Sequence, residues 1–103
     1  MTAEPNELQT SLPTLHRSAT ARLAARIKAI RGEMFGGPDG VAEIAAAFGL
    51  PTRTWAHYES GVTMPATILL AFIELTGANP HWLLTGNGPR RIEYGPFLNV
   101  EPT

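Results

Sequence analysis

Three polar side chains share the outer side of a short helix that the sequence predicts over residues 51–59. Thr52, Arg53 and His57 lie opposite the single apolar stripe of this segment, which is bounded by glycines. A small domain can hold such a helix while the helix presents hydrogen-bonding groups to a groove, which is how base-pair edges in duplex DNA are read. Arginine and histidine can bond a base or a phosphate, and threonine can contact a phosphate or a thymine methyl. The alternative is an ordinary solvated helix face.

Several basic and hydroxyl side chains outside this helix could contact a DNA backbone. The basic residues gather on the first predicted helix, mostly away from its apolar stripe, and Arg17 before them could also lie along a phosphate backbone. The hydroxyl residues follow the 51–59 helix in a loop, where amides and hydroxyls often meet phosphate. Runs of charge are usually only solvated faces, and this alternative stays open for each of them. The candidate phosphate contacts are Arg22, Arg26, Lys28, Ser60 and Thr63.

Net charge by itself neither requires nor excludes a nucleic-acid partner. The 103-residue chain carries a formal net charge of −1. All eight basic residues lie between Arg17 and Arg91, whereas four of the nine acidic residues lie nearer the ends. Residues 16–91 therefore hold eight positive and five negative charges, a net of +3, which is compatible with DNA binding.

The residue types argue against a metal centre, an enzyme and a membrane span. The chain has no cysteine, and its three histidines lie in different predicted elements with no carboxylate at ligand spacing. No activated nucleophile, phosphate loop or carboxylate pair marks a catalytic site, and no cofactor or small-molecule ligand is indicated. No apolar run nears the roughly 18 residues of a membrane helix and no signal peptide is evident, so we expect a cytoplasmic location.

Glycine, proline and capping residues divide the chain into short helices. A first helix begins at Ser18 or Thr20 and has apolar residues at three- and four-residue steps. The remaining helices are predicted at 40–48, 51–59, 65–76 and from Pro80 onward. The helix at 65–76 is apolar on most sides, so we expect it to be central. Because the core lacks strand signals, the predicted fold class is all-α, a compact five-helix bundle.

The predicted organisation is a single folded domain with a tail at each end. The N-terminal residues contain prolines and scattered polar residues without a period, and the last segment has apolar residues but no firm period either. We predict a mobile arm over 1–17, the folded domain over 18–89, and a C-terminal tail over 90–103 that is a possible dimer contact.

Three segments that follow one another along the chain resemble the Cro/CI-type (XRE-like) helix-turn-helix repressors, a lambda repressor-like DNA-binding family. Residues 26–31 (RIKAIR) resemble the first helix of that family. Residues 44–49 followed by the ending YESG at 58–61 resemble its helix-turn-helix unit, and residues 79–89 (NPHWLLTGNGP) resemble the close of phage repressor DNA-binding domains. Together the segments cover about residues 20–89.

The resemblance implies a sequence-specific regulator of transcription that binds double-stranded DNA, with a repressor of bacterial or phage type as the leading interpretation. The helix at 51–59 would enter the major groove and contact bases through Thr52, Arg53 and His57, while the preceding helix crosses the backbone. One such helix covers only a few base pairs, so we expect a homodimer on an inverted-repeat operator. The fifth helix and residues 92–100 are the candidate dimer contact.

The resemblance also assigns structural roles to residues that spacing alone does not connect. Arg31 and Glu59 are implied to form a salt bridge that joins the first helix to the end of the third. Trp55 could stack on a base if it were exposed, but the family pattern places this position in the core. The alternative for Arg31 and Glu59 is two independent surface charges.

The chain departs from the family pattern in three places. The connection over 32–40 is longer than usual, Gly40 and Val41 replace a polar pair at the start of the second helix, and Pro51 replaces the hydroxyl residue that caps the third. Val41 cannot donate to a phosphate, so one customary contact is missing. These departures and the near-zero net charge favour an alternative function, a protein-interaction module such as an antitoxin-like or adaptor domain built on the same bundle.

Overall fold

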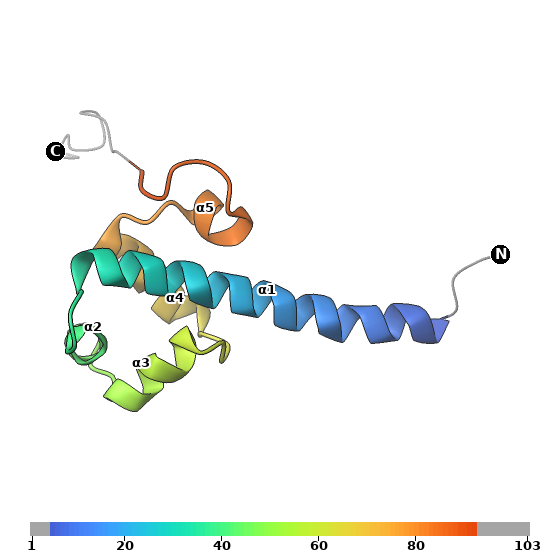
Figure 1. Cartoon of the computed structure of the whole chain (residues 1–103), viewed down its shortest axis with the longest axis horizontal. Coiled ribbons are helices and arrows are strands. Elements are labelled where there is room, and N and C mark those ends of the chain that lie inside the picture. Colours follow the sequence, from blue (N-terminus) through green and yellow to red (C-terminus); the bar gives the residue numbers. More distant parts are fainter. Residues whose placement is uncertain (1–4, 93–103) are drawn as a thin grey trace, which may run out of the picture.

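The computed structural model describes residues 5–92, with side chains from Arg17 onward. Its five helices are α1 (Pro5–Met34), α2 (Gly40–Ala47), α3 (Thr52–Glu59), α4 (Ala66–Thr76) and α5 (Pro80–Thr85) (Figure 1). The described part contains no strand, only an isolated antiparallel bridge between Ala78 and Arg91. The predicted all-α architecture of five helices is confirmed. No helix among these residues combines the length and apolarity needed to cross a membrane.

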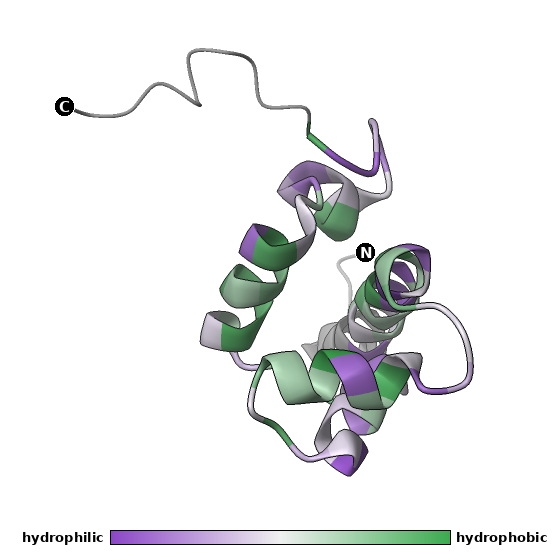
Figure 2. Cartoon of the chain, turned by 90° about the vertical axis from the view of Figure 1, so that its left-hand side faces the viewer, coloured by the Kyte–Doolittle hydropathy of each residue, from purple (hydrophilic) through white to green (hydrophobic). Residues whose placement is uncertain are grey.

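The helix α1 is the element against which all the other helices pack. It contacts each of the other four helices. Two views at right angles, in Figures 1 and 2, place α5 on one side of α1 and α3 on the opposite side. The stripe of α1 that faces the core carries Ala24, Ile27 and Ile30, all buried at helical spacing.

The start of α1 differs from the sequence prediction. The helix begins at Pro5, not at Ser18 or Thr20, and its N-terminal half extends beyond the other helices (Figure 1). Proline suits the first helical position, where its missing N–H would have no intrahelical partner. Nucleation is the costly step in helix formation, so a helix held by packing further along can propagate toward Pro5. Within the arm predicted over 1–17, residues 5–17 are therefore helical, and residues 1–4 lie outside the described part.

The prediction that the helix at 65–76 is central was wrong. Only Phe72 and Thr76 of α4 are buried, whereas Leu70 is 61% exposed and Leu75 is 42% exposed. Apolarity on most sides predicts a helix covered on most sides, but the other helices meet α4 on one side only. The helix α4 therefore packs through one stripe and leaves apolar side chains on the surface.

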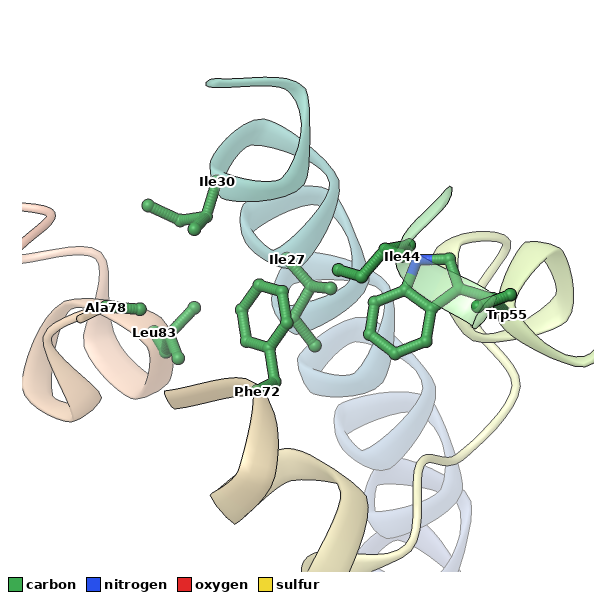
Figure 3. Packing of buried hydrophobic residues seen from close by; sticks show 8 residues of the cluster. Ile27, Ile30, Ile44, Trp55, Phe72, Ala78 and Leu83 are labelled. Carbon is green, nitrogen blue, oxygen red and sulfur yellow. The ribbon is translucent and has the colours of Figure 1, made fainter. Parts of the chain in front are cut away.

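Trp55 is the largest side chain of the core, in which residues from all the helices meet (Figure 3). Its indole stacks on Phe48, with ring centroids 5.2 Å apart and planes 8° apart. Tyr58 lies edge-on to it at 5.8 Å, and Phe72 lies tilted at the same centroid distance. The prediction that Trp55 belongs to the core is confirmed, and base stacking by its fully buried ring is excluded.

Asn79 holds the C-terminal part of the domain in place through three hydrogen bonds. Its side-chain oxygen caps α5 by accepting a hydrogen bond from His81 N at 3.0 Å, as the predicted Asn-Pro start of this helix requires. Its amide group donates to the Pro89 carbonyl at 2.8 Å, and its backbone N–H donates to the Arg90 carbonyl at 2.8 Å. These bonds turn the chain after α5 back toward α4.

Residues 90–92 belong to the packed domain, beyond the boundary predicted at residue 89. Glu33 of α1 forms ion pairs with Arg90 at 2.6 Å and with Arg91 at 3.0 Å. Arg91 also donates to the Thr76 carbonyl at the end of α4. The rest of the predicted tail, with most of the candidate dimer contact, lies outside the described residues.

Candidate nucleic-acid interface

Four exposed side chains form what we call the outer face of α3: Thr52, Arg53, Ala56 and His57. The face lies opposite buried Trp55, and it carries no acidic side chain. The single carboxylate of α3, on Glu59, is turned inward with only 7% of the side chain exposed. Ala56 was not predicted as part of this face, although its spacing of one helical turn from Thr52 was an available signal.

The N-terminus of α3 is left open by the residues that start it. Gly49 has a φ of +67°, so it provides the left-handed turn that was predicted between α2 and α3. Pro51 then starts α3 with a φ of −60° and a ψ of 145°, and no side chain caps the helix. The first amide N–H groups of α3 have no intrahelical partner, so they can bind solvent or an anion.

The Arg31–Glu59 pair that the resemblance implied is formed, and it fixes the end of α3 to α1. Arg31 Nε donates to Glu59 Oε2 at 2.8 Å and Arg31 Nη2 donates to Oε1 at 2.9 Å, a bidentate geometry. Trp55 Nε1 also donates to Oε2, at 2.8 Å. The carboxylate thus accepts three hydrogen bonds, two from α1 and one from the core aromatic cluster.

Burial makes this pair a rigid support. The side chains of Arg31 and Glu59 are only 11% and 7% exposed. The hydrogen bond to Glu59 raises the pKa of Arg31 above its ordinary value, and the negative charge of the same carboxylate adds to this effect. The guanidinium, like that of any arginine, is charged at every ordinary pH, and in this buried position it depends on Glu59 for its compensation. Because Glu59 is the last residue of α3, the ion pair also helps to fix the orientation of α3 relative to α1.

Gly40 is the residue that lets α2 approach this support. A Cβ at Gly40 would overlap the Phe35 carbonyl oxygen and would lie 2.8 Å from Arg31 Nη1, which itself donates to that carbonyl at 3.0 Å. The departure from the family pattern at this position therefore has a packing reason. We expect Gly40→Ala to lower the free energy of unfolding by about 1–3 kcal/mol, as overpacking does, in a urea titration followed by circular dichroism.

Gly32 offers a matched control for this prediction. It also lies in a helix, but a Cβ at Gly32 would meet no heavy atom within 4 Å. Gly32→Ala is expected to stabilise the protein by about 0.5–1 kcal/mol, because alanine loses less backbone entropy in a helix. Equal effects of the two substitutions would show that close packing at Gly40 is not what requires glycine there.

Arg26, predicted to contact phosphate, forms a hydrogen bond to another helix of the protein. Its Nη1 donates to the Leu83 carbonyl in α5 at 3.0 Å, in a partly buried position. The last carbonyls of a helix lack intrahelical partners and attract cations, which explains this contact. Arg22 lies one turn earlier on the same side of α1 and donates to Ser18 Oγ. Arg26 therefore faces α5, and Arg22 shares that side of α1 because it lies four residues away.

A groove beside the C-terminal end of α3 gathers other candidate phosphate contacts. This open groove, of about 350 Å³, is lined by Arg17, Thr20 and Ala21 of α1 and by residues 60–63 of the loop after α3. Ser60 Oγ donates to the His57 carbonyl at 2.7 Å, and Thr63 is exposed. The structure thus brings Arg17, Ser60 and Thr63 together.

Lys28 belongs to the same side of the molecule as this groove. It is exposed and lies eleven residues after Arg17, which is close to three full helical turns. The two cations therefore share one side of α1, whereas Arg22 and Arg26 share another. The sequence identifies the basic residues of α1, but it does not show which neighbouring helix each of them faces.

A second open pocket in the described chain, of about 690 Å³, includes Arg90 and Arg91, but both arginines are paired there with Glu33. No three His, Asp or Glu side chains are grouped as a metal site requires within residues whose side chains the structure describes. Comparison of the chain with models of known protein families, with curated proteins and with solved structures finds no match. The function of this protein therefore has to be inferred from its own residues and their geometry.

Proposed function

We propose that this protein is a sequence-specific regulator of transcription, acting as a repressor, that binds double-stranded DNA. In this proposal α2 and α3 form a helix-turn-helix of the lambda repressor-like type, with α3 in the major groove and α2 across the backbone. Arg53 and His57 bond base edges, and Arg17, Lys28, Ser60 and Thr63 contact phosphates. Such a protein would act in the cytoplasm of a bacterium, where its operator DNA lies.

The outer face of α3 is the observation that supports this proposal most. All four of its side chains are exposed, and the helix carries its one carboxylate on the inner side. A polyanion can therefore approach the face without meeting like charge. The buried Arg31–Glu59–Trp55 network fixes the helix from behind, which reduces the conformational entropy lost on binding.

Useful specificity would need a second copy of the chain. One helix in the groove reads only a few base pairs, so we propose a homodimer on an inverted repeat, with half-site centres roughly 34 Å apart. The fifth helix remains the proposed contact, and the 67% exposure of Leu84 on α5 supports it. Apolar side chains exposed on a small domain are typical of an interface.

The salt dependence of binding tests the proposal. Affinity for duplex DNA should fall steeply as salt rises, with a slope of log K against log salt of about −0.9 per phosphate contact. Fluorescence anisotropy with a labelled duplex, selected from a random pool, would measure this slope. Arg53→Ala should cost about 1–3 kcal/mol on the selected duplex and much less on a random one, because a base contact is sequence-specific.

Two arginine variants of α1 provide matched controls. Arg17→Ala should weaken binding to both duplexes alike and reduce the salt slope by about one contact, as loss of a phosphate contact does. Arg22→Ala removes the same charge from the side of α1 that faces α5, so the slope should not change. Equal effects of the two variants would contradict the proposal that the DNA backbone lies beside Arg17.

A protein-interaction module is the second candidate function. The exposed apolar residues of α4, Leu70 and Leu75, favour it, because apolar surface of this kind suits a protein partner better than DNA. A module of this class predicts little affinity for duplex DNA at any salt concentration. The same titration therefore separates the two functions.

A further inference from the structure

The outer face of α3 divides into two parallel lines of different chemistry. Arg53 and His57, four residues apart, carry hydrogen-bonding groups along one line. Thr52 and Ala56, also four residues apart, carry methyl groups along the other. Residues four apart lie above one another on a helix, so the second line is a methyl stripe, defined by the Cγ2 of Thr52 and the Cβ of Ala56.

Only one kind of base edge matches an alanine methyl in the major groove. Each base edge there presents hydrogen-bond donors or acceptors, and thymine adds a 5-methyl group. Ala56 can neither donate nor accept a hydrogen bond. A polar edge covered by its methyl would lose water without gaining a partner, which is unfavourable. The 5-methyl of thymine, in contrast, gains apolar contact.

We propose that the methyl stripe reads thymine: Thr52 and Ala56 each contact the 5-methyl group of a thymine beside the bases bonded by Arg53 and His57. This inference rests on the proposed function and specifies the base class that α3 selects. Four helical residues span about 6 Å, close to two base-pair steps of about 3.4 Å each. The two thymines should therefore lie within about two base pairs of each other.

Replacement of thymine by deoxyuridine tests this inference, because it removes only the methyl group. The probe is the duplex selected from a random pool, with each thymine replaced in turn. Two positions in each half-site should each lose about fourfold in affinity, the effect expected for one buried methyl. All other thymines should tolerate the replacement.

Protein variants then assign each methyl to its partner. Thr52→Ser keeps the hydroxyl and removes the methyl, and Ala56→Gly removes the methyl at the other position. Each variant should bring the thymine-to-deoxyuridine affinity ratio to about one at a single position and leave the other position sensitive. Any loss of helix stability in Ala56→Gly affects both duplexes equally, so the ratio remains informative.

The outcomes separate this inference from the proposed function. A selected duplex whose binding is indifferent to every deoxyuridine replacement overturns the methyl stripe and leaves DNA binding intact. The same holds if methyl sensitivity is present but unchanged by Thr52→Ser and Ala56→Gly. Failure to select any duplex overturns both the function and the inference.

Discussion

Glu59→Gln should lower the free energy of unfolding by about 3–5 kcal/mol, the loss expected when one partner of a buried ion pair is removed. The carboxylate accepts hydrogen bonds from Arg31 Nε, Arg31 Nη2 and Trp55 Nε1. Glutamine has one acceptor oxygen and no charge, so a buried guanidinium loses its compensation and at least one donor competes for a partner. Urea titration followed by circular dichroism would measure the difference.

Glu33→Gln makes the same chemical change in an exposed pair and serves as the control. Glu33 pairs with Arg90 and Arg91 at the surface, where its side chain is 32% exposed. Solvent screens such pairs, so we expect a loss of less than about 1 kcal/mol. If both variants lost the same stability, the Arg31–Glu59 pair would be no more than a surface contact, and α3 would be oriented by apolar packing alone.

Trp55→Ala should cost about 3–5 kcal/mol, the usual range for removing a buried aromatic side chain from a core. Trp55 is fully buried and contacts the rings of Phe48, Tyr58 and Phe72. The cavity left behind separates α3 from the rest of the bundle. Since a small domain is stable by only about 5–15 kcal/mol, a large part of the protein should be unfolded already in mild urea.

Trp82→Ala is the matched substitution for this prediction. Trp82 packs against the same core but is only half-buried, so its loss should cost clearly less. Trp55→Phe should fall between the wild type and Trp55→Ala, because a phenyl ring keeps stacking area but cannot donate to Glu59. A Trp55→Ala variant as stable as Trp82→Ala would contradict the central position assigned to Trp55.

Together the two variants test how α3 is held for binding. Arg31 joins Glu59 of α3 to the Phe35 carbonyl, and Gly40 of α2 lies against the same guanidinium. The ends of α1 and α3 therefore share one polar network, against which the start of α2 packs. A side chain on the outer face of α3 contributes to binding only if this network holds the helix in one orientation.

The helices were largely predictable because their signals are local. Asn79 followed by Pro80 starts α5 as predicted, and Gly49 forms the predicted turn before α3. The predicted bounds of α2 to α5 agree with the structure to within a residue or so. Capping groups, glycines and prolines act on neighbouring residues, so their effect can be read from a short stretch of sequence.

Contacts between distant residues were harder to predict. Arg31 and Glu59 are 28 residues apart, and no spacing rule connects them; only the resemblance to a known family did so. Arg26 was predicted to contact phosphate, but it bonds a carbonyl 57 residues away in α5. The exposed side of α4 was also not predictable, because apolarity does not tell which helix takes the centre of a bundle.

The sequence by itself determined where most helices begin and end, which stripe of each is apolar, and that Thr52, Arg53 and His57 share a face of α3. Only the tertiary structure decided which polar groups on these helices are engaged within the protein and which remain free. Glu59 is buried against Arg31, whereas Arg53 is exposed, although both belong to one short helix. The reason is physical: local periodicity orients a side chain on its own helix, but the helices packed around it determine its partner and its access to solvent.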